Sequence, residues 1–191
     1  ALRQPLEERE IVISRSKGSA TFPAHFTLVA AMNPCPCGNF GTDKPCVCPQ
    51  NSLLRYQRKI SGPIMDRIDL WIPVGRIEHS KLSEKKKQGK ASAETKKVRA
   101  AVASARQIQR ARFEKMKRPI RTNSEMNMRD LGKLVPLTPD VVRLLNEASG
   151  KLGLSPRSYH RVIKLARTIA DLEKSKAVKA EHVLEALQYR P

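Results

Sequence analysis

Thr27–Met32 (TLVAAM), followed at once by Asn33-Pro34, decides the fold of the first part of the chain. A short apolar run bounded by turn residues is typical of a strand buried in a parallel sheet. Asp69–Val74 (DLWIPV) has the same character. These two segments predict an α/β fold for residues 1–82. An initial helix over Ala1–Arg9 and two core strands cannot close such a sheet, so we expect its remaining strands upstream of Ala1.

Other segments of this α/β part have distinct patterns. Glu10–Arg15 and Ala20–Phe26 have extended character on either side of Ser16–Ser19 (SKGS), where Gly18 can adopt a positive φ, and they predict a β-hairpin. A loop rich in Cys, Pro and Gly follows. The pattern then predicts a helix over Gln50–Ile60 and a helical turn over Ile64–Ile68.

The remainder of the chain predicts an all-α domain. Lysines cluster and apolar residues nearly vanish over 83–97, which indicates a basic flexible linker. Residues 98–191 then show helical spacing. Thr138-Pro139 and Ser155-Pro156 are helix start signals, Gly150–Gly153 ends the first of these two helices, and a last helix covers Ala180–Gln188. We expect about four helices and a structural i,i+4 pair between Arg167 and Asp171.

Composition favours a polyanionic partner. The 191 residues include 37 Lys and Arg against 18 Asp and Glu, a formal net charge of +19. Such an excess favours nucleic acid or nucleotide phosphates; the alternative is a basic, well-solvated surface with one lysine-rich loop. The sequence contains no run of about 20 apolar residues, the length that a membrane-spanning helix needs. Without a secretion signal, we expect a cytoplasmic protein that keeps its thiols reduced.

The four cysteines suit a metal. Cys35, Cys37, Cys46 and Cys48 follow the pattern C-x-C-x8-C-x-C. Four thiolates in a short loop can close a tetrahedral, structural Zn²⁺ site. A loop with so little apolar content needs something to hold it, which favours zinc over the alternative of four reduced cysteines in a proline-rich loop.

Three separated motifs carry a family resemblance. FPAHFTLVAAMNPCPCG at Phe22–Gly38, RYQRKISGPIMDRIDL at Arg55–Leu70, and LSPRSYHRVIKLARTIADLE at Leu154–Glu173 with EALQYR near the C-terminus resemble the ComM/YifB branch of the magnesium-chelatase-like AAA+ proteins. The resemblance implies the end of an AAA+ P-loop core, followed by a helical lid domain, in an ATPase that uses ATP and Mg²⁺. No G-x4-G-K-[ST] motif occurs in the chain. We therefore expect both Walker motifs upstream and no ATP hydrolysis by this chain alone.

The resemblance also implies roles for individual residues. Asn33 occupies the sensor-1 position; the alternative is that Asn-Pro only ends a strand. Arg67, in PIMDRIDL, is the expected arginine finger, acting on a neighbouring subunit of a ring that is hexameric by analogy; the alternative is a surface arginine paired with Asp66 or Asp69. Arg55 and Arg58 are weaker candidates for the same role.

The lid contributes its own candidates. Arg157 stands in the first turn of a helix, where the helix dipole disfavours a cation. An arginine at this position is understandable if the helix N-terminus and the guanidinium bind the same anion. It resembles the sensor-2 residue, and Arg161, one turn on, is the second choice. The alternative is a solvated surface arginine.

Arg15 and Lys17, at the tip of the predicted hairpin, are the expected DNA contacts. Related AAA+ motors place a pore-facing hairpin between the Walker B segment and the sensor strand, which is where this hairpin is expected to lie. The alternative is a hairpin that packs on the next subunit. Few aromatic residues are present, so we expect contacts to phosphates without sequence preference. The function that follows is an ATP-driven AAA+ ring motor that remodels DNA, with branch migration during natural transformation as the implied role. The alternatives are a magnesium-chelatase-type motor subunit and a non-enzymatic, zinc-stabilised DNA-binding module.

Overall fold

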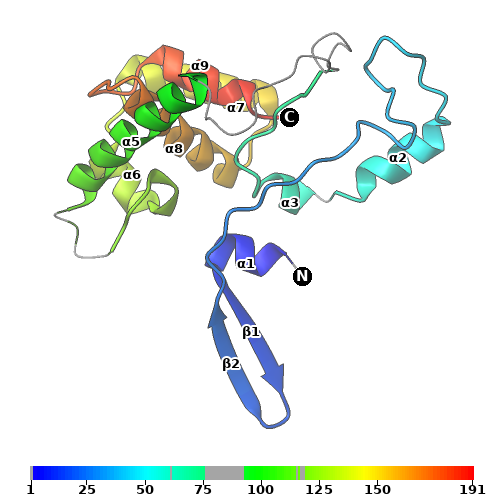
Figure 1. Ribbon diagram of the computed structural model, residues 1–191, viewed down its shortest axis with the longest axis horizontal. Coiled ribbons are helices and arrows are strands. Elements are labelled where there is room, and N and C mark those ends of the chain that lie inside the picture. The colour runs from blue at the N-terminus through cyan, green and yellow to red at the C-terminus, as the bar shows by residue number, and fades with distance from the viewer. Residues whose placement is uncertain (1, 61, 76–92, 115, 117–118) are drawn as a thin grey trace. The chain divides into compact units, whose positions relative to one another are not determined.

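The computed structural model describes residues 2–60, 62–75, 93–114, 116 and 119–191 (Figure 1). The chain divides into two compact units, Ala1–Ile68 and Asp69–Pro191. None of the described helices is long and apolar enough to cross a membrane.

Unit 1 contains a hairpin and three helices. Helix α1 covers Arg3–Glu8, strands β1 and β2 cover Glu10–Arg15 and Gly18–Pro23, and helices α2 and α3 cover Gln50–Arg58 and Gly62–Met65. The predicted hairpin, helix and helical turn are thus present, with slightly shorter bounds. Among the described residues of this unit only Pro5 and Cys35 are buried, so unit 1 has almost no apolar core.

The hairpin is a regular antiparallel ribbon, seen in dark blue in Figure 1. Ile11 pairs with Phe22, Ile13 with Ala20 and Arg15 with Gly18. Because side chains alternate along a strand, these pairs share one face, which is apolar up to Arg15. Gly18 has a φ of 140°, which is the positive value that the sequence predicts for the turn.

The two predicted buried strands are wrong for this chain. Thr27–Met32 and Asp69–Val74 have no strand structure, and the only sheet within the described residues is the pair β1–β2. Val29 is 89% exposed and Val74 is 86% exposed. A parallel strand exists through a ladder of hydrogen bonds to its neighbours. Within the described residues Thr27–Met32 pairs with no strand, and Asp69–Val74 makes one isolated backbone bond, from the Trp71 amide to the Tyr189 carbonyl at 3.0 Å. Both segments are apolar, but no sheet within the described residues buries them.

Unit 2 is helical, as predicted. Its elements are α5 (Ala93–Phe113), a 3₁₀ turn η1 (Asn123–Glu125), α6 (Met128–Leu134), α7 (Pro139–Leu152), α8 (Pro156–Leu172) and α9 (Ala180–Gln188). One apolar core joins them, with Met126, Leu145, Val162, Ala166 and Val183 almost completely buried. Residues 93–97 of the predicted linker belong to α5, and residues 83–92 lie outside the described part of the chain.

Local signals set the helix ends. The Ser155 hydroxyl accepts a hydrogen bond from the Ser158 amide at 3.2 Å and caps α8. Gly153 ends α7 in the left-handed region, with φ 60°. Helix α6 was missed by the sequence analysis, although Asn127 and Asp130 form a capping box at its start.

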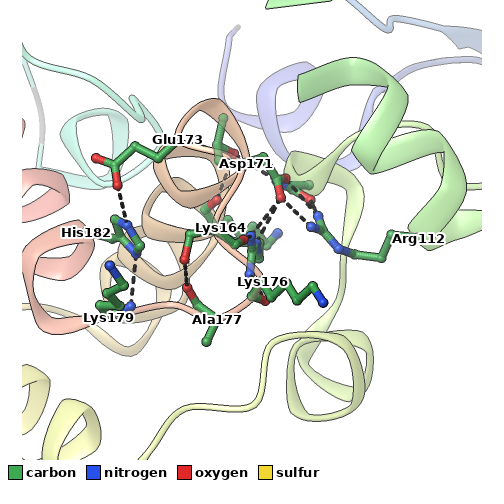
Figure 2. A network of polar contacts seen from close by, with 12 residues as sticks. Arg112, Lys164, Asp171, Glu173, Lys176, Ala177, Lys179 and His182 are labelled. Carbon is green, nitrogen blue, oxygen red and sulfur yellow. Dashed lines mark hydrogen bonds and ion pairs between the residues drawn. The ribbon is translucent and has the colours of Figure 1, made fainter. Parts of the chain in front are cut away.

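A buried polar network joins three elements of unit 2 (Figure 2). The Asp171 carboxylate is fully buried and accepts hydrogen bonds from both terminal nitrogens of Arg112, from Asn123 Nδ2 at 2.8 Å and from Arg167 Nε at 3.1 Å. The predicted pair between Arg167 and Asp171 is therefore confirmed. The partners Arg112 and Asn123, which come from α5 and η1, had no signal in the sequence.

The network changes the acidity of its members. Burial alone would raise the pKa of Asp171, but the hydrogen bonds from Arg112 and Asn123 and the charges of the two guanidinium groups hold this pKa below its usual value. Burial lowers the pKa of Arg167, and Asp171 opposes that shift. The Asp171 carboxylate therefore remains charged, because its charge is stabilised by the guanidinium groups of Arg112 and Arg167.

Candidate functional site

The four predicted ligand cysteines come together in unit 1. The Sγ atoms of Cys35 and Cys37 are 3.3 Å apart, those of Cys35 and Cys46 are 3.7 Å apart, and those of Cys37 and Cys46 are 3.6 Å apart. All four Sγ atoms lie within 4.8 Å of one another. A tetrahedron of thiolates about 2.3 Å from zinc has edges of about 3.8 Å. The cluster therefore has the size and the donor set of a four-thiolate zinc site.

The loop backbone builds this cluster. Gly38 has φ 78° and its amide donates to the Cys35 carbonyl at 3.0 Å, which reverses the chain after Cys37. The Phe40 amide donates to Cys35 Sγ at 3.3 Å, and the Cys37 amide donates to Cys48 Sγ at 3.4 Å. Such N–H donors stabilise sulfur as thiolate.

The thiols of the cluster differ in acidity. Hydrogen bonds, foremost from the Asn39 amide, lower the pKa of Cys37 to about 6. Burial, followed by the neighbouring thiols, raises the pKa of Cys48 to about 12. One thiolate thus forms readily, whereas a fourth negative charge in the same small volume is opposed. A divalent cation supplies the charge that allows all four thiols to deprotonate.

A second His/Glu group does not fit a metal. His182, Glu173 and Glu181 are close enough to share an ion. However, His182 Nδ1 accepts the Lys179 backbone amide at 2.9 Å, and His182 Nε2 lies 2.9 Å from Glu173 (Figure 2). Both ring nitrogens are thus engaged, with the Nε2 proton directed at Glu173. This group caps α9.

Asn33 lies between the cysteine loop and α2. Its carbonyl accepts a hydrogen bond from the Tyr56 hydroxyl at 3.0 Å. Its side-chain nitrogen would be 3.8 Å from a Cβ atom placed on Gly38. The side chain is exposed, and the loop and α2 together fix its position. The structure does not place it at the end of a buried strand.

Arg67 is mostly buried. Its guanidinium pairs with Glu7 of α1 and donates to the Pro63 carbonyl at 2.5 Å, and its side chain is 11% exposed. The alternative partners expected from the sequence were Asp66 and Asp69, but the ion pair forms with Glu7 instead. In this arrangement Arg67 ties α3 to α1.

The two lid arginines differ in their surroundings within unit 2. Arg157 is exposed in the first turn of α8. Arg161 pairs with Asp69, and its side chain is 18% exposed. Arg157 is thus the more accessible of the two.

Arg15 and Lys17 are both exposed where the hairpin reverses. Every residue from Ile11 to Pro23 is exposed, so the hairpin stands clear of the rest of unit 1. Both cations at the tip are therefore accessible to a binding partner.

Comparison with known proteins covers both parts of the chain. Residues 1–82 match the family described as magnesium chelatase, subunit ChlI, and residues 92–190 match its C-terminal domain. The chain is 40% identical over its whole length to the competence protein ComM of Haemophilus influenzae. It is 37% identical to YifB of Salmonella typhimurium and 34% identical to protein Mb2921c of Mycobacterium bovis, again over its whole length.

The alignment covers only part of each relative. The chain spans 35% of the length of ComM and 36% of the length of YifB. The three motifs at Phe22–Gly38, Arg55–Leu70 and Leu154–Glu173 fall inside the matched residues. The chain belongs to the magnesium chelatase ChlI family and is a relative of ComM and YifB within it.

Proposed function

We propose that this chain is the C-terminal part of an ATP-driven AAA+ ring motor that acts on DNA. The hairpin supports this most directly, because Arg15 and Lys17 are exposed at its tip and the only acidic residue of the two strands, Glu10, lies at the opposite end of β1. The net charge of +19 and the similarity to a competence protein support the same substrate. Branch migration or a related remodelling of DNA is the activity that fits.

The chain supplies part of the ATPase site in this proposal. The match to one third of each relative leaves room for the phosphate-binding loop upstream. Asn33 orients the attacking water or a phosphate oxygen, and Arg157, with Arg161 as second choice, contacts the nucleotide. Arg67 acts on the ATP of the neighbouring subunit in a hexameric ring. It must leave Glu7 to do so, so the ion pair is the resting state of the finger.

We also propose that the cysteine cluster holds one structural Zn²⁺ through Cys35, Cys37, Cys46 and Cys48. The spacing of the sulfur atoms supports this. Metal analysis of the purified chain should give about one zinc per chain. A Cys46→Ser variant should lose that zinc, whereas a Ser52→Ala variant in the adjacent helix should keep it. Four thiols that react together with a thiol reagent in native buffer would contradict the site.

The DNA proposal is tested in the full-length protein. Changing Arg15 and Lys17 together to Ala should reduce DNA-stimulated ATP hydrolysis and leave the basal rate intact, because neither residue is among those proposed to contact the nucleotide. Changing Lys133 and Lys151 to Ala removes the same charge from exposed helix positions and is the matched control. An ATPase indifferent to every DNA tested would reject the proposal.

The family description favours one second candidate. A chelatase-type motor would use the same ATPase parts to drive metal insertion through a tetrapyrrole-binding partner. Stimulation of hydrolysis by such a partner, and not by DNA, would select it. A non-enzymatic DNA-binding module is the third candidate, and ATP hydrolysis by the full-length protein would exclude it.

A further inference from the structure

A small pocket lies beside the cysteine loop in unit 1. Its lining comes from one face of α2, from the residue that caps the end of α2 and from one residue of the loop: Ser52, Arg55, Tyr56, Lys59 and Pro36. We call this the α2 pocket. Ser52, Arg55, Tyr56 and Lys59 are spaced by three or four residues, so they lie on the same side of the helix. From the sequence, Arg55 is only a weaker candidate for the arginine finger.

Arg55 and Lys59 form an uncompensated pair of cations. They stand four residues apart, a spacing at which like charges destabilise a helix. The sequence has no Asp or Glu between Asp43 and Asp66. Neither cation has an acidic partner within the described residues, and both are exposed. An anion in the α2 pocket would remove this repulsion.

Packing does not explain the arrangement. Helix α2 has no buried residue, so no core requires this face to point where it does. The helix is fixed instead by its surroundings in the chain: it begins two residues after Cys48, and Tyr56 donates to the Asn33 carbonyl at 3.0 Å. Pro36 stands between two of the clustered cysteines. The cysteine loop therefore places both the helix and the opposite wall of the pocket.

The lining indicates which anion the pocket takes. Ser52 offers a hydroxyl, and Arg55 and Lys59 offer charged N–H donors, all suited to phosphate oxygens. The Tyr56 ring has its hydroxyl engaged by Asn33 and lies 6.0 Å from Lys59 Nζ, so it does not offer a free stacking platform. A mononucleotide needs a largely apolar cavity that encloses its base, which this small pocket, lined mostly by exposed residues, does not provide.

We propose that the α2 pocket is a second DNA-binding site, which contacts the phosphodiester backbone through Ser52, Arg55 and Lys59. Its three donors are different residues from the hairpin cations and from the proposed nucleotide contacts, although Tyr56 of the pocket also contacts the Asn33 carbonyl. The choice of DNA as the polyanion rests on the proposed function. The contact has no sequence preference, because nothing in the pocket reads a base edge.

The test measures binding of fluorescently labelled duplex DNA to the 191-residue chain by anisotropy, without nucleotide, over a range of salt concentrations. Changing Arg55 and Lys59 together to Gln removes both charges and keeps good helix formers. Changing Lys133 and Lys151 to Gln is the matched control, since it lowers the net charge equally at exposed sites in unit 2. Circular dichroism and zinc content establish that each variant is folded.

Loss of two phosphate contacts should make the negative slope of log K, the association constant, against log salt shallower by about 1.8 for duplex DNA and about 1.4 for a single strand. At 0.1 M salt this corresponds to roughly 60-fold and 25-fold weaker binding, respectively. The control should change the affinity by much less. A variant with Ser52→Ala alone should weaken binding mildly and leave the salt slope unchanged.

Three outcomes would overturn the proposal. Equal losses in the Arg55/Lys59 variant and the control would show that net charge alone matters. Loss only in the Arg15/Lys17 variant would confine DNA binding to the hairpin and leave the proposed function intact. Displacement of the DNA by millimolar ATP, with no effect of the Arg55 and Lys59 changes, would identify a nucleotide site elsewhere. DNA stimulation of ATP hydrolysis in the full-length protein tests the proposed function independently of all three.

Discussion

Replacement of Asp171 by Asn should destabilise unit 2 severely. Asn preserves the shape of the side chain, but it removes the charge and turns an NH₂ group toward N–H donors. Arg167 is 3% exposed and would lose its counter-charge. Because Asn keeps only one oxygen, an NH₂ group would face either the donors at Oδ1, which are Arg112 and Arg167, or those at Oδ2, which are Arg112 and Asn123. Breaking a buried ion pair from one side costs about 3–5 kcal/mol. For a unit of this size, that loss lowers the melting temperature by roughly 10–20 °C.

Thermal unfolding of the purified chain, followed by far-ultraviolet circular dichroism, measures this loss, because unit 2 supplies most of the helical signal. Asp140→Asn is the matched control. Asp140 makes an ion pair with Arg143 at 2.9 Å, but the two side chains are 82% and 72% exposed. Such a pair contributes about 0–1 kcal/mol. Equal melting temperatures for the two variants would show that the network does not stabilise the fold as argued here.

Three further predictions follow from the same structure. The pKa of Asp171 is lower in the folded state than in the unfolded state, where it lies near 4. The charged carboxylate therefore stabilises the fold fully above about pH 4, and this stabilisation is lost as pH falls through the folded pKa. The difference in the free energy of unfolding between the wild type and Asp171→Asn should thus narrow only below about pH 4, as unfolding curves at several pH values would measure. Gly150→Ala should raise the free energy of unfolding by up to about 1 kcal/mol, whereas Gly153→Ala, at φ 60°, should lower it by about 1 kcal/mol, as urea titration would reveal. Arg67→Ala in the full-length protein should abolish ATP hydrolysis but not ATP binding, and rings mixed with wild-type subunits should show whether the residue acts across subunits.

The helical unit was predictable from sequence because its signals are local. Ser155-Pro156 and Gly153 mark helix ends by backbone chemistry that acts within a few residues. The hairpin was predictable for the same reason, since Gly18 and the flanking extended runs are adjacent in the chain. Helix α6 was missed because its seven residues are too few for a clear apolar period, although its capping box was readable.

Contacts between distant residues were not predictable in this way. Arg112 and Asp171 are 59 residues apart, and Arg67 and Glu7 are 60 residues apart, so no local pattern relates them. Thr27–Met32 was assigned to a sheet from its composition, but a strand also needs partners. The cysteine cluster was the exception, because a short loop with regular spacing already limits where four sulfur atoms can lie.

The hairpin also has a consequence for the handling of this chain. A two-stranded ribbon has an open edge on each side, and open edges recruit strands from other copies. Ile11, Val12 and Ile13 form a run of high β-propensity along one of these edges. Arg15 and Lys17 oppose such pairing, because copies stacked edge to edge in register would bring like charges together. Salt that screens this repulsion should therefore promote self-association, so concentrated samples should remain monodisperse longest in dilute buffer.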